Sequence, residues 1–228
     1  MVVVVVEAGC VMAEREPRGV VDGAFRVLWA LPEAGRKHQV ARLAQLTALP
    51  RPTVHRLLGQ LRRSGAVEWT DGHWTLSASL LGLARQVEPL AGLRETASKV
   101  IQRLREETGA AVSLVVPSDG SFVALEMVPG REALPIDARS GARMPESTAA
   151  AMVLTPSATP AARRRPFGAA VDDQDVFVGL TCYAVPVGLP GGRRASLQIA
   201  TAAQRPADRL AASVHRAAAA LERRLSGL

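Results

Sequence analysis

Apolar residues at helical spacing predict two short helices near the start of the chain. The first is expected over about residues 23–31 and ends before Pro32. Its apolar positions are Phe25, Val27, Leu28 and Leu31. The second is expected from Val40 to Leu46 with a single apolar stripe, and a tight turn follows at residues 47–50.

A third helix is predicted directly after that turn. Pro52 suits the first turn of a helix, because its missing N–H leaves no hydrogen bond unmade there. Apolar residues then recur at the spacing of a buried face until Ser64 and Gly65 close the helix. They are Val54, Leu57, Leu58 and Leu61. Two short helices joined by a tight turn are typical of a helix-turn-helix.

Burying that face leaves a polar set pointing outward, clustered toward the N-terminal half of the third helix. Its members are Arg51, Thr53, His55, Arg56 and Gln60. In a helix-turn-helix this half enters the major groove, where arginine can pair with guanine and glutamine with adenine. We therefore expect these residues to bind DNA, together with Lys37 and Gln39 near the start of the second helix. The alternative is an ordinary solvated helix face.

A β-hairpin is predicted immediately after the third helix. Asp71-Gly72 separates two β-prone runs, and this dipeptide is a strong signal for a type I′ turn. A hairpin in this position is a wing, whose tip can reach the adjacent DNA backbone or minor groove. His73 is the candidate for that contact, whereas Trp69 and Trp74 are expected to be packing residues.

Positive charge is concentrated in the same part of the chain. Of the 228 residues, those from 18 to 94 hold eleven Lys and Arg against five Asp and Glu, an excess of six out of a net charge of +7. A segment that faces phosphates is expected to carry such an excess. The alternative is an arginine-rich composition throughout, so the charge supports the helical pattern without replacing it.

Composition excludes several other classes. No apolar run approaches the roughly 18 residues of a membrane span. Cys10 and Cys182 are far apart and have no paired histidines nearby, so they offer neither a disulfide framework nor a zinc site. We therefore expect no metal and no cofactor, and a location in the reducing cytoplasm.

The first residues imitate a lipoprotein signal but lack its physical features. Ala8-Gly9-Cys10 follows five valines, yet no basic residue precedes them and Glu7 interrupts the apolar stretch. We expect residues 1–17 to form a disordered tail. Translation starts at either Met1 or Met12, and the sequence leaves both open.

The second half of the chain predicts a sheet with helices on it. A helix is expected from Leu93 to Glu107, and a final alanine-rich helix over about residues 206–225. Strands are expected at residues 111–116, 122–128, 182–187 and 194–201. With the N-terminal helices, this makes the chain an α+β protein.

The segment from Leu49 to Leu58, with Gly65, the hairpin and residues 76–83, resembles the IclR-type transcription regulators. Thinner similarity continues to Leu225. The resemblance implies a winged helix-turn-helix that reads operator DNA, a linker helix, and a C-terminal GAF-like α/β domain that binds a small effector. On that basis the expected parts are a DNA-binding domain at 18–78, a linker helix at 79–92 and an effector-binding and oligomerisation domain at 93–228.

The second half also departs from that family. IclR-type chains usually carry a few dozen residues of helices before the strand with the cysteine, whereas here Leu154 is followed within about thirty residues by Cys182. We therefore expect a shortened effector domain, with Ser147, Thr148 and Cys182 as the polar groups of any effector site. The alternatives are a helix N-cap for Ser147 or Thr148 and a packed core thiol for Cys182.

The expected function is regulation of transcription from a palindromic operator, bound as a dimer or a dimer of dimers, because one short helix covers too few base pairs for specificity. Apolar residues between Leu76 and Val87 are the expected joining surface. One alternative is a constitutive or architectural DNA-binding protein that takes no ligand. An enzyme that uses Cys182 with His215 or Ser147 is less expected, because nothing in the sequence assembles that pair.

Overall fold

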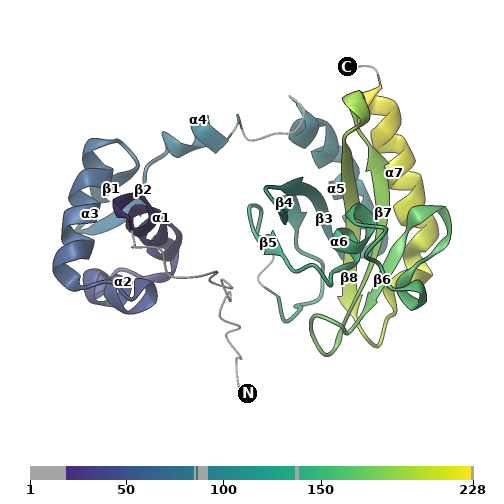
Figure 1. The fold of residues 1–228 in the computed structure, drawn as a ribbon, viewed down its shortest axis with the longest axis horizontal. Coiled ribbons are helices and arrows are strands. Elements are labelled where there is room, and N and C mark those ends of the chain that lie inside the picture. Colours follow the sequence, from purple (N-terminus) through teal and green to yellow (C-terminus); the bar gives the residue numbers. More distant parts are fainter. Residues whose placement is uncertain (1–18, 85, 87–91, 137–138, 227–228) are drawn as a thin grey trace. The chain divides into compact units, whose positions relative to one another are not determined.

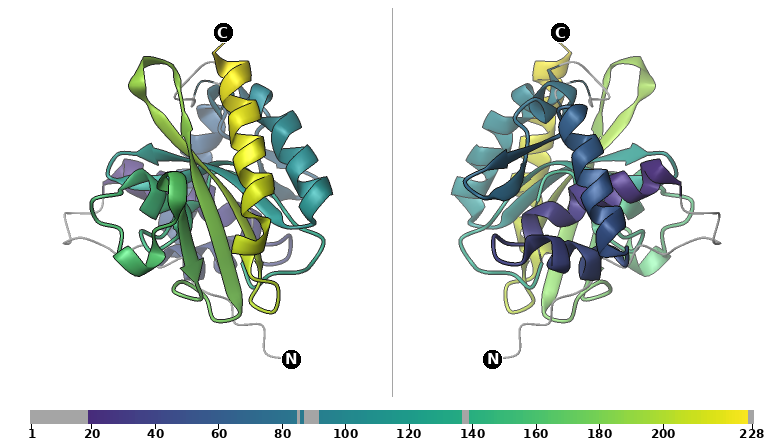
Figure 2. Two further views of the ribbon diagram at one scale, coloured as in Figure 1. Left: turned by 90° about the vertical axis from the view of Figure 1, so that its right-hand side faces the viewer. Right: turned by 90° about the vertical axis from the view of Figure 1, so that its left-hand side faces the viewer.

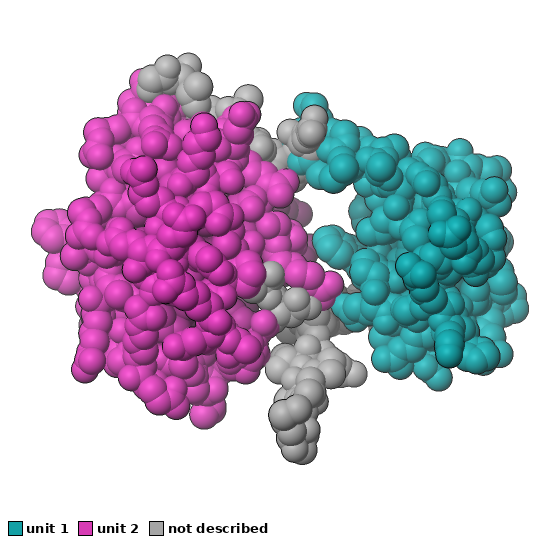
Figure 3. Space-filling model, turned by 180° about the vertical axis from the view of Figure 1, so that it is seen from behind, with its two compact units in different colours: residues 1–86 teal, residues 87–228 magenta. Residues whose placement is uncertain are grey.

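In the computed structural model, residues 19–84, 86, 92–136 and 139–226 are described, and the chain divides into two compact units (Figure 3). The first unit is residues 1–86 and the second is residues 87–228. The change of unit falls within the linker expected at residues 79–92. The expected tail at residues 1–17 lies outside the described residues.

The first unit is a helical domain with one β-hairpin (Figure 1). Its elements are α1 (Val20–Ala30), the 3-10 turn η1 (Leu31–Glu33), α2 (Gln39–Thr47), α3 (Arg51–Arg63), β1 (Val67–Thr70), β2 (His73–Leu76) and α4 (Leu80–Ala84). Three helices and a hairpin follow one another as the sequence predicted. Of the described linker residues, the five of α4 are helical.

One apolar core joins the three helices of this unit. Val27 of α1 and Leu43 of α2 are fully buried against the four apolar residues of α3, which are buried as predicted. The prediction was wrong for Phe25, whose side chain is 58% exposed. Phe25 lies two residues before Val27, or about 200° around the helix, and therefore faces away from the core.

Helix α3 ends in two backbone hydrogen bonds that require a residue in the left-handed conformation. Gly65 has φ +77°, a conformation that costs glycine little. The Gly65 N–H donates to the Arg62 carbonyl at 3.1 Å, and the Ala66 N–H donates to the Leu61 carbonyl at 2.8 Å. These two bonds form a Schellman motif, and they turn the chain from α3 into the wing.

The wing is a two-stranded antiparallel hairpin with a type I′ turn. Asp71 and Gly72 both have positive φ, at 52° and 76°, as that turn requires. Trp69 and Trp74 pair across the strands, with ring centroids 5.0 Å apart in an edge-to-face arrangement. The two tryptophans pack on each other, as predicted.

The second unit is built on a six-stranded antiparallel sheet in the order β5-β4-β3-β8-β7-β6. Its strands are β3 (Ala111–Ser118), β4 (Ser121–Val128), β5 (Arg143–Met144), β6 (Ala170–Asp173), β7 (Leu180–Gly188) and β8 (Arg194–Ala202). Its helices are α5 (Leu93–Thr108), α6 (Ala149–Leu154) and α7 (Ala211–Leu225), with short 3-10 turns at Ala161–Arg163, Pro166–Gly168, Pro190–Gly192 and Ala207–Leu210.

Helices cover the sheet on both faces. α5 and α7 lie side by side on one face, while α6 packs on the other (Figure 2). The strands are therefore buried on both sides, and β7 alternates between Tyr183, which faces α5 and α7, and Cys182, which faces α6. Two strands, β5 and β6, were not predicted from the sequence. Residues 155–179 form no α-helix, which agrees with the shortening expected before Cys182.

Candidate nucleic-acid interface

Helix α3 presents a polar surface at its N-terminal half. Arg51, His55 and Arg56 are exposed and Thr53 is partly exposed. They are held in place because Val54, Leu57, Leu58 and Leu61, on the other side of the helix, are all buried in the core of the unit. A rigidly anchored helix that presents its outward half to solvent has the form of a recognition helix.

Within the described residues, no acidic side chain neutralises the charge of this surface. α3 contains four arginines and no acidic residue. Among the ion pairs of the described residues, none involves Arg51 or Arg56. The N-terminus of a helix also carries a partial positive charge, so the end of α3 that holds Arg51 attracts an anion such as a phosphate.

Gln39 does not belong to this surface, and its prediction as a DNA-binding residue was wrong. Its side chain is 7% exposed. Its Nε2 donates to the Trp74 carbonyl at 2.9 Å, and its Oε1 accepts from the Trp74 N–H at 2.7 Å. The carboxamide thus pairs with β2 as a further strand would, and it fastens α2 to the wing.

Replacing Gln39 with leucine should lower the free energy of unfolding of the first unit by about 1–2 kcal/mol, because both polar backbone groups of Trp74 lose their partner. Gln45→Leu is the matched control, since Gln45 lies on the same helix and is exposed. Chemical denaturation followed by tryptophan fluorescence measures both variants. Equal stabilities would contradict the role assigned to Gln39.

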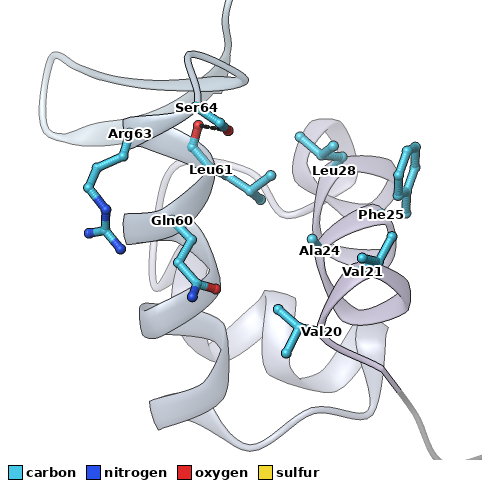
Figure 4. A pocket seen from close by; sticks show the side chains of 9 residues that line it. All are labelled: Val20, Val21, Ala24, Phe25, Leu28, Gln60, Leu61, Arg63 and Ser64. Carbon is cyan, nitrogen blue, oxygen red and sulfur yellow. Dashed lines mark hydrogen bonds between the residues drawn. The ribbon is translucent and has the colours of Figure 1, made fainter.

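Gln60 also departs from its prediction. Its Oε1 is buried and has no hydrogen-bond partner among the described residues. Figure 4 shows its side chain in the space between α3 and α1, because α1 packs beside the C-terminal half of α3. The carboxamide oxygen of Gln60 is therefore not available to pair with a base.

Lys37 and His73 remain at the surface. Lys37 is exposed in the turn before α2, with Arg36 and His38 exposed beside it. Arg36 and His38 were not predicted as DNA-binding residues, although they flank Lys37 in the sequence. His73 is partly buried at the wing tip, and its Nδ1 lies 3.3 Å from the Asp71 carbonyl oxygen.

The three residues expected at an effector site differ in their surroundings. Ser147 is exposed, whereas Thr148 is buried as the N-cap of α6. The Thr148 hydroxyl accepts from the Ala151 N–H at 3.3 Å and donates to the Pro145 carbonyl at 2.8 Å. The next free N–H of α6, that of Ala150, donates to the Gln198 Oε1 at 2.8 Å. The N-terminus of α6 is therefore satisfied by the chain itself.

Cys182 is 2% exposed and lies among small side chains that include the alanines of α6. Asp172, on the neighbouring strand β6, is its partner in the strand pairing. Burial, with the nearby Asp172 charge, raises the pKa of the thiol well above its usual value. Burial likewise raises the pKa of Asp172. A buried thiol held in its protonated form is a poor nucleophile.

Cys182 and His215, the nucleophile and base that an enzyme would need, are separated by the sheet. Nε2 of His215, on α7, lies 3.0 Å from the hydroxyl oxygen of Tyr183, which faces α5 and α7. Cys182 faces α6 on the opposite side of the sheet. Desolvation lowers the pKa of His215 and raises that of Tyr183. His215 therefore has no path to act as a base toward Cys182.

The described part of the chain has neither a helix able to cross a membrane nor a cluster of metal ligands. None of its helices combines the length and the apolar character that crossing a membrane requires. Within the same residues, no group of three or more His, Cys, Asp or Glu side chains is placed to hold a metal ion.

The sequence of the first unit matches a known domain. Residues 20–71 match the IclR helix-turn-helix domain. The chain is 31% identical over 144 residues to the probable transcriptional regulator SauR of Cupriavidus necator, which covers 62% of this chain and 57% of that protein. It is 25% identical over 125 residues to the transcriptional repressor IclR of Escherichia coli, covering 53% of this chain and 46% of that protein. The chain spans about half the length of these relatives.

Solved structures share the fold over nearly the whole chain. An IclR homolog from Microbacterium hydrocarbonoxydans, solved in complex with 4-hydroxybenzoate, is 20% identical, with a TM-score of 0.70 over 92% of this chain and 100% of that one. The IclR protein of Thermotoga maritima is 17% identical, with a TM-score of 0.67 over 90% of this chain and 98% of that one. Residues 20–71 are thus an IclR helix-turn-helix domain by sequence, and the chain shares its fold with solved IclR homologs.

Proposed function

We propose that the protein is a transcription regulator that binds a specific DNA operator through α3 and the wing. The observation that carries this proposal is the exposed arginine surface, without an ion pair among the described residues, on a helix whose other face is buried in the core. The proposed DNA-binding residues are Lys37, Arg51, Thr53, His55, Arg56 and His73. This activity belongs in the cytoplasm and requires no catalytic residue.

The proposal includes two-fold assembly. Leu81 and Leu83 of α4 are 65% and 68% exposed, and Leu76 at the end of β2 is 42% exposed. The structure offers these leucines no partner within the described residues of their unit, so a second copy of the chain is the proposed partner. Val87, also expected in this surface, lies outside the described residues.

Sequencing of DNA fragments selected by the purified full chain is expected to return one two-fold symmetric site. Its half-sites should lie about 10–10.5 base pairs apart or at a multiple of that spacing, since each copy places one α3 in a major groove. Light scattering at micromolar concentration should give the mass of a dimer or a tetramer. A monomer, or DNA recovered without a shared motif, would contradict the proposal.

Control by an effector in the second unit is proposed for Ser147, Thr148 and Cys182, by analogy with the homolog solved with 4-hydroxybenzoate. The internal bonds of Thr148 and the burial of Cys182 favour the alternative, a constitutive regulator, because a ligand would have to displace them. An effector-controlled regulator and a constitutive regulator differ in how operator affinity responds to a ligand. An effector must change operator affinity, typically about 5–150-fold, whereas a constitutive regulator keeps one affinity.

A further inference from the structure

A groove of about 550 Å³ lies between α1 and α3 in the first unit (Figure 4). Its walls are mostly apolar and include Val21, Ala24 and Leu28 of α1 and Leu61 of α3. Small-molecule sites typically have volumes of about 300–1,000 Å³ and apolar walls with a few polar groups. The groove meets both criteria, and it borders the C-terminal half of α3 rather than the half proposed to enter DNA.

Two polar groups at the groove have no partner among the described residues. The Gln60 Oε1 is a buried acceptor that receives no hydrogen bond. Arg63 lines the groove and takes part in none of the ion pairs found among the described residues. Figure 4 shows the Arg63 side chain running back along α3, at the rim of the groove on the side of Gln60 that is away from α1. By contrast, the Ser64 hydroxyl already donates to the Leu61 carbonyl at 3.0 Å.

A buried acceptor without a donor is unfavourable, and an arginine without an acid favours an anion. We propose that this groove binds a small amphipathic anion. The apolar body of the ligand lies against Ala24, Leu28 and Leu61. A hydrogen-bond donor on the ligand meets the Gln60 carboxamide oxygen after a rotation of that side chain, and the anionic group meets Arg63.

The position of the groove also suggests what the ligand does. A molecule between α1 and α3 contacts both helices at once, so it changes how α3 is seated on α1. Because α3 carries the proposed DNA contacts, occupancy of the groove should change DNA affinity. This regulatory part rests on the proposed function, whereas ligand binding itself does not.

The test uses 8-anilinonaphthalene-1-sulfonate, an aromatic anion with one N–H donor, and the full chain without DNA. Its fluorescence should rise to saturation at about one probe per chain, as for a single site. Arg63→Gln removes the cation and should weaken probe binding about tenfold, the loss expected for one charge-assisted contact. Ala24→Trp fills the groove and should weaken probe binding at least as much, because the apolar body of the probe loses its place. Arg62→Gln and Trp29→Ala are the matched controls, because both residues are exposed on the same two helices but do not line the groove.

Several outcomes overturn the site. Equal probe affinity in wild type and Arg63→Gln would show that the groove does not bind the anion. The Arg63→Gln variant keeps the test valid if Ala24→Trp does not fold. A loss in Trp29→Ala would mean that the probe binds the general apolar surface of α1. Probe affinity that falls as the chain associates at higher concentration would show that a second copy covers the groove.

The regulatory part is tested by repeating the titration with the selected operator fragment. Operator DNA should change probe affinity about fivefold or more, because linkage between two sites is reciprocal. Unchanged probe affinity would rule out coupling between the groove and DNA binding. It would not contradict ligand binding in the groove. A chain that binds the probe but selects no DNA would contradict the proposed function alone.

Discussion

Arg56→Ala is expected to weaken binding to the selected operator by about 1–3 kcal/mol, which is roughly a fivefold to 150-fold increase in Kd. Arg56 is exposed on the outward face of α3, and its neighbours Leu57 and Leu58 are fully buried. The substitution therefore removes a contact to DNA without disturbing the core. The same result is expected for Arg51→Ala at the start of the helix.

Titration of labelled operator at several salt concentrations measures this effect and separates two kinds of contact. If the arginine contacts a base, the loss is confined to the operator sequence. If it contacts a phosphate, the loss is similar for all sequences, and the slope of log affinity against log salt falls by about 1. Arg103→Ala is the control, because Arg103 is exposed on α5 in the other unit and carries the same charge. Unchanged affinity in both α3 variants would remove α3 as the reading helix.

Leu58→Ala is expected to lower the free energy of unfolding of the first unit by about 2–5 kcal/mol. Leu58 is 0% exposed and lies in the cluster that joins α3 to α1 and α2. Removing its side chain leaves a cavity that the helices close only in part. Because α3 is seated on this cluster, the variant should also bind operator more weakly.

Fluorescence can follow the two units separately in this experiment. The three tryptophans, Trp29, Trp69 and Trp74, all lie in the first unit, and the single tyrosine, Tyr183, lies in the second. The tryptophan transition should shift to lower denaturant in Leu58→Ala. Leu46→Ala, at a leucine of the same unit that is 36% exposed, should shift it much less. Similar shifts in the two variants would argue against the assigned core.

The elements predicted best are those specified by neighbours in the chain. The buried face of α3 follows from the spacing of four apolar residues, and the wing turn follows from Asp71-Gly72, whose positive φ angles the structure shows. β6 was missed because Ala170–Asp173 is short and takes its place only by pairing with β7. Such pairing leaves little local signal, since it depends on residues that come later in the chain.

The residues misjudged within the candidate site were those whose roles depend on distant partners. Gln39 looked like any polar residue at the start of a helix, but its two bonds reach Trp74, 35 positions away. Gln60 lies on α3, but the neighbouring α1 forms a groove with α3, and Gln60 lines that groove. Cys182 is buried because α6 packs over it. Its burial and the nearby Asp172 raise the pKa of its thiol, which keeps the thiol protonated.

The sequence by itself determined that this protein has a helix-turn-helix with an arginine-bearing third helix, because helical period, turn chemistry and charge are local properties of the chain. The tertiary structure alone decided which polar side chains remain free. Bonding to β2 buries Gln39, and the carboxamide oxygen of Gln60 is buried beside α1, while Arg51 and Arg56 stay exposed. Burial and hydrogen bonding depend on which segments lie side by side in the folded protein. The spacing of residues along the chain does not specify those contacts.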